Sequence, residues 1–165
     1  MEKQNFEITS IGIIRTPYKD VAPYQPLVHD ENEIIVEVFP EYTEGLTNLT
    51  EFEYILVLYY LHRVNKKVEM MIKPPWAKGK EVGLFASRSP VRPNPIGISV
   101  VKIKKIEGNK IFTSGLDVFD GTPLIDIKPY IKDLDEKSNA NHGWVDGLDD
   151  NEHLAMHIKG IPHSH

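Results

Sequence analysis

The sequence predicts a mainly β protein, built as a barrel or a sandwich with one or two short helices. Seven short runs rich in β-branched and aromatic residues follow one another, with turn residues between them, as in small all-β domains. Neither G-x-G-x-x-G nor G-x-x-x-x-G-K-[ST] occurs, and strands do not alternate with helices. A doubly wound nucleotide-binding fold is therefore not expected.

The first predicted strands occupy residues 6–16, 33–39 and 52–62. The segment "FEITSIGIIRT" combines apolar alternation with β-branched residues, which is typical of a half-buried strand. The third run, "FEYILVLYYLH", is apolar enough that we expect it to be buried on both faces. A short helix is predicted near 43–52, where two leucines lie three residues apart.

Four further strands are predicted, at 81–87, 97–106, 110–116 and 123–131. The Gly-Asn pair inside "IEGNKI" indicates a tight hairpin turn between the second and third of these. No long linker or internal repeat is visible, so we expect one domain over residues 1–165. Its core would cover about 6–131, followed by an irregular tail over 134–165 in which Trp144 is the only large anchor.

The composition indicates the cellular compartment of the protein and excludes some kinds of site. The 165 residues include no cysteine, which excludes disulfides and thiolate metal sites and fits the cytoplasm. No secretory signal is visible, and the longest apolar run, 54–61, is too short to span a bilayer. The ending carries His157, His163 and His165, either a metal-binding tail or simply a frayed end. We expect no metal.

Charge is unevenly distributed along the chain. The net charge is −5, yet residues 63–110 hold twelve lysines and arginines against three acids. Both flanking segments are acidic. The middle third is expected to form a basic face for nucleic acid, or else to be a set of solvated lysines paired with acids on neighbouring strands.

The stretch "RSPVRPNPIG", residues 88–97, is the most unusual segment. Its three prolines lack amide hydrogens and bias the preceding residues toward extended geometry, which predicts a stiff loop. Arg88, Arg92 and Asn94 would project from this loop at fixed spacing. The arginines would either grip a carboxylate or phosphate or bridge the acidic flanks.

Three other segments carry polar groups suited to a site. "TPYKDVAPYQPLV" (16–28) is a second proline-stiffened loop, read as a ligand wall or a plain connection. "LHR" ends the most apolar strand, where His62 is either a packed histidine or part of a site. "LDVFDGTPLIDIKPY" (116–130) has an Asp-Gly turn. Its Asp126 and Lys128 would share one face of a strand.

These segments together resemble the TrmO-type (YaeB/VirR-like) family of S-adenosylmethionine-dependent tRNA methyltransferases. The resemblance lies in "GIIRTPYKD", "QP", "FEYILVLYYLHR", "GLFASRSPVRPNPIGIS" and "LDVFDGTPLIDIKPY", and covers about residues 6–131. It implies a single-sheet β-barrel and a homodimer with its site near the subunit interface. The implied reaction is methylation of N6 of N6-threonylcarbamoyladenosine at tRNA position 37. Some relatives carry an extra C-terminal domain, for which we expect this chain to be too short.

The resemblance also implies which residues hold the cofactor, S-adenosylmethionine. They are Gln25, Pro26, Leu27, His62, Arg63, Arg88, Ile98, Asp120, Gly121, Thr122 and Pro123. Arg92, Asn94 and Lys128 are expected to contact the tRNA substrate, with Arg92 lying further out than Arg88. No catalytic base is assigned. Two alternatives stay open: a non-enzymatic barrel that binds an adenosine-type metabolite or RNA, and a methyltransferase for small molecules.

Overall fold

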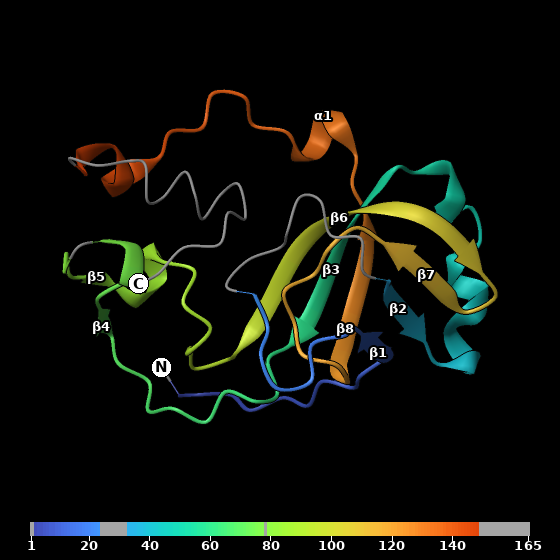
Figure 1. Ribbon diagram of the computed structural model, residues 1–165, viewed down its shortest axis with the longest axis horizontal. Coiled ribbons are helices and arrows are strands. Elements are labelled where there is room, and N and C mark those ends of the chain that lie inside the picture. The colour runs from blue at the N-terminus through green and yellow to red at the C-terminus, as the bar shows by residue number, and fades with distance from the viewer. Residues whose placement is uncertain (1, 24–32, 78, 149–165) are drawn as a thin grey trace.

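A computed structural model describes residues 2–23, 33–77 and 79–148 (Figure 1). Six antiparallel strands pair as a closed barrel in the order β1-β2-β7-β6-β3-β8. They are β1 (Gly12–Arg15), β2 (Ile34–Val38), β3 (Tyr54–Tyr60), β6 (Ile96–Glu107), β7 (Lys110–Thr113) and β8 (Thr122–Pro129). The mainly β class with few short helices is confirmed.

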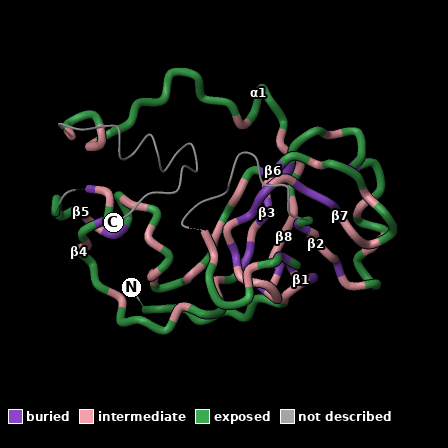
Figure 2. Tube along the Cα trace, in the orientation of Figure 1, coloured by how far each residue is buried: buried purple, intermediate pink, exposed green. Residues whose placement is uncertain are grey.

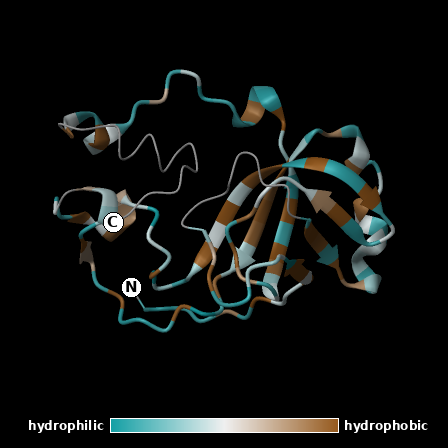
Figure 3. Ribbon diagram, in the orientation of Figure 1, coloured by the Kyte–Doolittle hydropathy of each residue, from teal (hydrophilic) through white to brown (hydrophobic). Residues whose placement is uncertain are grey.

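The barrel interior is the hydrophobic core, and strand alternation fills it. Ile55, Val57 and Tyr59 of β3 point inward, while the residues between them face outward. Figure 2 shows the buried residues concentrated in the barrel strands, and Figure 3 shows hydrophobic and hydrophilic residues alternating along them. A register shift between Leu58 and Tyr59, where β3 pairs with β8, ends the regular alternation of β8. Bulges of this kind re-aim the side chains that follow.

Residues 61–95 leave the barrel after β3 and return to it at β6; we call them the excursion. It contains β4 (Met71–Ile72) and β5 (Val82–Gly83), paired as a second small sheet, and the 3-10 helices η3 (Pro75–Ala77) and η4 (Leu84–Ala86). The Leu61 amide donates to the Pro95 carbonyl at 2.8 Å. This bond closes the base of the excursion, which extends away from the barrel in Figure 1.

The chain after β8 crosses back to the excursion. It forms α1 (Lys132–Asp135) and then η5 (Gly143–Gly147), and Figure 1 shows η5 beside the β4–β5 sheet. The Trp144 ring stacks on Trp76, with centroids 5.2 Å apart, and its Nε1 donates to the Ala86 carbonyl at 2.8 Å. The expected role of Trp144 as an anchor is confirmed, and its partner is the excursion.

Several predicted boundaries need correction. The first strand begins at Gly12 instead of residue 6, because β2 ends at Val38 and Pro40 follows soon after, so residues 2–10 have no partner strand. β3 is buried on one face only, since Tyr54 and Tyr60 are exposed. Residues 81–87 form a two-residue strand followed by η4.

Other predictions at this level are confirmed or refined. The hairpin turn is Gly108–Asn109, with Glu107 opposite Lys110 and a positive φ of 59° at Gly108. The helix predicted near 43–52 is two 3-10 helices, η1 (Pro40–Leu46) and η2 (Leu49–Glu51). Within the part of the chain that the structure describes, no helix is long and apolar enough to cross a membrane. His157, His163 and His165 lie outside the described residues.

Candidate functional site

One end of the barrel gathers most of the predicted site segments. The register places Ile14 opposite Thr122, Tyr60 opposite Ile96 and Ile34 opposite Thr113. β1, β3 and β7 therefore end here, and β2, β6 and β8 begin here. We call this end the site rim. The excursion leaves and returns at the same rim, as does the connection between β1 and β2.

A hydrogen-bond network at the site rim joins the loop after β1 to the Asp-Gly turn before β8. The Thr16 hydroxyl donates to the Val118 carbonyl at 2.9 Å, and the Thr16 amide donates to Asp120 Oδ1 at 3.2 Å. The Asp120 amide in turn donates to the Tyr18 carbonyl at 2.8 Å. Asp120 thus fixes two loops that are about a hundred residues apart in sequence, as its separation of 104 from Thr16 shows.

The turn after Asp120 has the backbone that its sequence requires. Gly121 adopts a positive φ of 80°, a backbone conformation that residues other than glycine rarely adopt. Thr122 is buried, and its hydroxyl donates to the Phe119 carbonyl at 2.8 Å. Pro123 follows as part of β8. The predicted Asp-Gly turn is therefore confirmed, and it lies at the rim.

Arg63 connects the end of β3 to this network. Its Nη1 donates to the Lys19 carbonyl, and its guanidinium lies 4.4 Å from the centroid of the Phe119 ring. A cation over an aromatic face is held in orientation as well as in place. Arg63 is exposed all the same, so it presents a fixed positive charge at the rim.

His62 lies next to this charge, and its pKa is lowered. Partial desolvation, and then the charge of Arg63, lower the pKa of His62 below its ordinary value, although a backbone hydrogen bond at Tyr60 opposes them. At neutral pH the imidazole can therefore accept or donate a hydrogen bond without adding a second positive charge. A cationic ligand would not be repelled by it.

Tyr59, Ser99 and Asp117 form a polar cluster at the rim end of the core. The Tyr59 hydroxyl lies 3.0 Å from Ser99 Oγ. Burial first, and then the charge of Asp117, raise the pKa of Tyr59 to about 12. Burial also raises the pKa of Asp117, for which the described residues offer no ion-pair partner. The cluster places a carboxylate with weak solvation beside a phenol that stays protonated.

Gly97 makes room for the Tyr59 ring. A Cβ atom at this position would lie 2.1 Å from Tyr59 Cε2, far inside van der Waals contact. The glycine that ends "RSPVRPNPIG" is thus required by packing against the neighbouring strand, where it sits opposite Tyr59.

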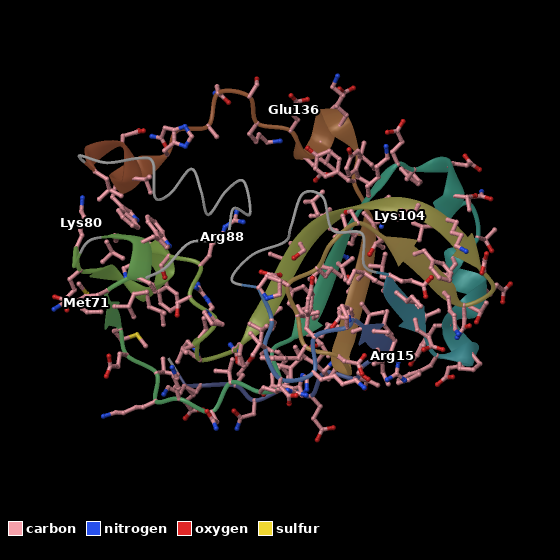
Figure 4. The ribbon with its side chains drawn as sticks, viewed as in Figure 1. Arg15, Met71, Lys80, Arg88, Lys104 and Glu136 are labelled. Carbon is pink, nitrogen blue, oxygen red and sulfur yellow. The ribbon has the colours of Figure 1, made fainter. Side chains whose placement is uncertain are left out.

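We call residues 88–97 the proline loop. Its two arginines differ in depth, in the opposite order to the one expected. Arg92 is half-buried, and its Nη1 donates to the carbonyls of Leu84, at 3.4 Å, and Ser87, at 3.0 Å. Arg88 is exposed, and Figure 4 shows it extending from the excursion between Lys80 and Met71 on one side and the barrel on the other. The expectation that Arg92 lies further out was wrong, because its guanidinium turns back to the carbonyls of Leu84 and Ser87, which precede the loop.

Serine side chains hold the rest of this loop. The Ser87 hydroxyl accepts from the Ser89 amide, and the Ser89 hydroxyl accepts from the Val91 amide, both at 3.3 Å. Such hydroxyl turns stabilise irregular backbone. Asn94 is exposed at the end of the loop. The loop is thus held by hydrogen bonds as well as by its prolines.

The structure separates some predicted residues from the rim network. Lys128 pairs with Asp126 at 2.7 Å on the outer face of β8, beyond the register shift, which confirms that the two share a face. Ile98 also points outward, from β6 opposite Leu58. Gln25, Pro26 and Leu27 lie outside the described residues.

Sequence reasoning missed several residues that shape this region. Tyr59 and Ser99 were not singled out, nor were Phe119, which lies under Arg63, and Gly97. A glycine opening a β-branched run was the only local sign of a close approach. The burial of Asp117 depends on strands distant in sequence and leaves no local signal.

Comparison with known proteins finds relatives over most of the chain. Residues 13–136 match the family model described as the tRNA-methyltransferase O N-terminal domain. A probable S-adenosyl-L-methionine-binding protein of Pyrococcus abyssi is 42% identical, covering 82% of this chain and 74% of that protein. A tRNA (adenine(37)-N6)-methyltransferase of Mus musculus is 34% identical, covering 86% of this chain and 34% of that protein.

A solved structure of similar fold was also found. The crystal structure of TrmO from Pseudomonas aeruginosa matches with a TM-score of 0.69 and 30% sequence identity, covering 85% of this chain and 62% of that one. The chain thus spans somewhat under two thirds of this solved relative and about a third of the mouse enzyme. With three quarters of its length matched, the chain belongs to the family of the tRNA-methyltransferase O N-terminal domain.

Proposed function

We propose that this protein is a cytoplasmic S-adenosylmethionine-dependent methyltransferase that acts on N6 of N6-threonylcarbamoyladenosine at tRNA position 37. The observation that carries the proposal is the site rim. Segments 16–20, 61–63 and 116–123 are far apart in sequence, and contacts of Arg63 and Asp120 bring them together. The names of the relatives in Pyrococcus abyssi and Mus musculus supply the cofactor and the reaction.

The donor set of the rim fits S-adenosylmethionine. Its carboxylate would pair with Arg63, whose guanidinium is already oriented by the Lys19 carbonyl and the Phe119 ring. A neutral His62 tolerates a sulfonium nearby. Asp120 uses Oδ1 to hold Thr16 and would offer its other oxygen to a ribose hydroxyl or to the ammonium group. Gly121, Thr122 and Pro123 would form the floor of the same turn.

Arg88 and the segment Gln25, Pro26 and Leu27 would complete this cofactor site. Arg88 extends from the excursion (Figure 4) and is exposed, so it is free to reach a ligand at the base of the excursion. The other three residues belong to the connection between β1 and β2, whose flanking strands end and begin at the site rim.

When bound, S-adenosylmethionine would supply an activated methyl group: the methyl–sulfur bond would break as the bond to N6 forms, leaving a neutral thioether, and the N6 proton would pass to water. The residues of this chain supply alignment. Loops fixed by Asp120, Arg63 and the serine turns of the proline loop keep their geometry with little loss of entropy on binding. We assign no general base to the departing proton.

We further propose a homodimer formed through the outer face of β3 and β6. Tyr60, Ile96, Ile98 and Val100 are exposed there, and their neighbours Leu56 and Leu58 face the same side. A contiguous exposed apolar surface of this kind marks an interaction site. Because Ile98 lies two residues inside the rim end of β6, a partner chain covering this face would bring Ile98 to the edge of the cofactor site.

The tRNA would lie on the side of the excursion. Arg92 and Asn94 are assigned to tRNA binding. Arg92 would act by shaping the loop, and Asn94 would offer an exposed hydrogen-bonding group. Lys128 could add a phosphate contact only by leaving Asp126, but the pair is exposed, and exchanging an exposed ion pair costs only about 0–1 kcal/mol.

Incubation with tRNA and methyl-labelled cofactor, followed by mass spectrometry of the nucleosides, tests the proposal. The label is expected on N6-threonylcarbamoyladenosine. Arg63→Ala should reduce methyl transfer about ten- to a hundredfold, as the loss of a charge-assisted hydrogen bond predicts. Arg15→Ala is the matched control, because Arg15 pairs with Glu37 on the outside of the barrel.

The outcome also separates the alternatives. Cofactor binding with no transfer to any tRNA nucleoside would contradict the enzymatic proposal and favour a barrel that only binds an adenosine-type metabolite. Transfer to a small molecule but not to tRNA would instead indicate a methyltransferase for small molecules.

A further inference from the structure

We propose that the excursion is an RNA-binding surface in which Phe85, backed by Arg92, stacks against one unpaired nucleobase. This inference rests on the proposed function for the identity of the RNA, which is tRNA. It adds Phe85 and the neighbouring basic groove as a binding element distinct from His62, Arg63 and Arg88, the excursion residues assigned to the cofactor, together with the part of the RNA that this element would recognise.

Phe85 is an exposed aromatic ring on a fixed backbone. Its side chain is 73% exposed, although it follows the buried Leu84 within η4. The Ser87 hydroxyl donates to the Leu84 carbonyl at 2.8 Å, and the Leu84 amide donates to the Met70 carbonyl at 2.8 Å. A ring presented this way loses little conformational entropy when a flat ligand covers it.

Arg92 backs this ring. Its guanidinium lies 5.5 Å from the centroid of Phe85 and is held by the carbonyls of Leu84 and Ser87. The same arginine therefore fixes the backbone of the loop and supports the aromatic side chain. Stacking of a base on an aromatic ring with an arginine nearby is how proteins bind single-stranded nucleic acid.

A groove next to the same loop has the charge that a phosphate backbone requires. It has a volume of about 340 Å³ and is lined by Lys66, Lys67, Glu69, Ile72, Ser89 and Val91. Both lysines are exposed, and neither forms an ion pair with another of the described residues. Ser89 and Val91 belong to the proline loop that also carries Arg92, so the groove and the Phe85 platform share one rigid element.

The positive charge of the excursion favours RNA over a protein as the partner. Residues 61–95 contain eight lysines and arginines against two acidic residues. A single exposed ring within a strongly basic segment suits a polyanion that also carries flat bases. A protein partner would instead be expected to meet a broader apolar surface, such as the outer face of β3 and β6.

The test measures tRNA affinity, without cofactor, over a range of salt concentrations. Phe85→Ala is expected to weaken binding about 5- to 150-fold, the range for loss of one base–aromatic stack. The dependence on salt should not change, because no charge is removed. Phe85→Trp should keep the affinity. Phe6→Ala is the matched control, since Phe6 is 75% exposed but lies outside the excursion, and it should bind like the wild type.

A double variant, Lys66→Gln with Lys67→Gln, tests the groove. It should weaken binding and lower the slope of log affinity against log salt by about one for each phosphate that is no longer neutralised. Calorimetry with S-adenosylmethionine on Phe85→Ala should match the wild type, which separates this inference from the cofactor site. Wild-type tRNA affinity in Phe85→Ala, or an equal loss in Phe6→Ala, would overturn the proposal. So would a wild-type chain that does not bind tRNA.

Discussion

The barrel and the excursion are held together in different ways. The barrel is closed by six ladders of backbone hydrogen bonds around a core whose aliphatic side chains are almost completely buried. The excursion has two strands of two residues each, and side-chain bonds to carbonyls, serine turns and a tryptophan pair hold much of the rest. Stability is concentrated in the first region, and exposed charge and aromatic surface in the second.

The difference suggests why the candidate site lies where the two regions meet. At the site rim, loops are tied directly to strands whose positions the core fixes, so Arg63 and Asp120 are held with precision. Further out, the excursion is held by local side-chain bonds in place of long strand ladders, and it presents the exposed charge and the aromatic ring that a large ligand such as folded RNA would contact.

Truncating the same residue type inside and outside the barrel should have very different effects. Leu124 is fully buried in β8, whereas Leu134 in α1 is 67% exposed. Leu124→Ala is expected to lower the free energy of unfolding by about 2–5 kcal/mol, and Leu134→Ala by at most about 0.5 kcal/mol. Urea titration followed by circular dichroism measures both. Similar losses in the two variants would contradict the description of the barrel as the stable core.

Two glycines offer a second matched pair. Gly97→Ala places a Cβ atom against the Tyr59 ring, and overpacking of this kind is expected to cost about 1–3 kcal/mol. Gly83→Ala in β5 meets no atom within 4 Å, so the free energy of unfolding should barely change. Thermal unfolding of both variants is the measurement. An undisturbed Gly97→Ala variant would mean that the Tyr59 ring moves aside at little cost.

Releasing the tail should loosen the excursion alone. Trp144→Ala removes the stack on Trp76 and the bond to the Ala86 carbonyl, and an aromatic pair is worth about 0.5–1.5 kcal/mol beyond its buried area. Hydrogen exchange at 71–86 should become faster, while barrel amides keep their protection. Trp144→Phe should recover part of the effect, because a ring remains. Faster exchange throughout β3 and β6 would show that the tail also supports the barrel.

Asp117 gives the smallest effect and a pH dependence of known sign. Because burial raises its pKa in the folded state, its contribution to stability is fully present below the ordinary carboxyl pKa and is lost as the pH rises through the folded value. Asp117→Asn should therefore stabilise the protein at neutral pH relative to the wild type, and the gain should vanish below about pH 4. The exposed Asp133→Asn is the control. A gain that is constant with pH would contradict the assigned cause.

The sequence predicted the barrel better than the excursion, for a physical reason. Alternating apolar residues specify strands locally, so β2, β3, β6 and β8 were found within a few residues, and Gly108 and Gly121 marked turns that only glycine adopts readily. The first strand is shorter than predicted because its partner β2 ends at Val38, opposite Gly12. The residues around Gly12 do not reveal where that partner ends.

At the candidate site, the local sequence predicted the kind of loop but not the depth of its arginines. The proline pattern of "RSPVRPNPIG" correctly indicated an irregular loop that leads into a strand. It could not show that Arg92 turns back onto the carbonyls of Leu84 and Ser87 while Arg88 stays exposed. The pairing of Trp76 with Trp144 and the burial of Asp117 also arise from contacts distant in sequence, which no local pattern encodes.

Hydrogen exchange of the wild-type protein with and without S-adenosylmethionine tests most directly that the site rim binds the cofactor. Protection is predicted in peptides that cover 16–20, 61–63 and 116–123, because these segments would hold the ligand. Peptides around the Gly108–Asn109 turn, at the opposite end of the barrel, should be unchanged. Protection at that opposite end, or no protection at the rim with saturating cofactor, would contradict a cofactor site at the rim.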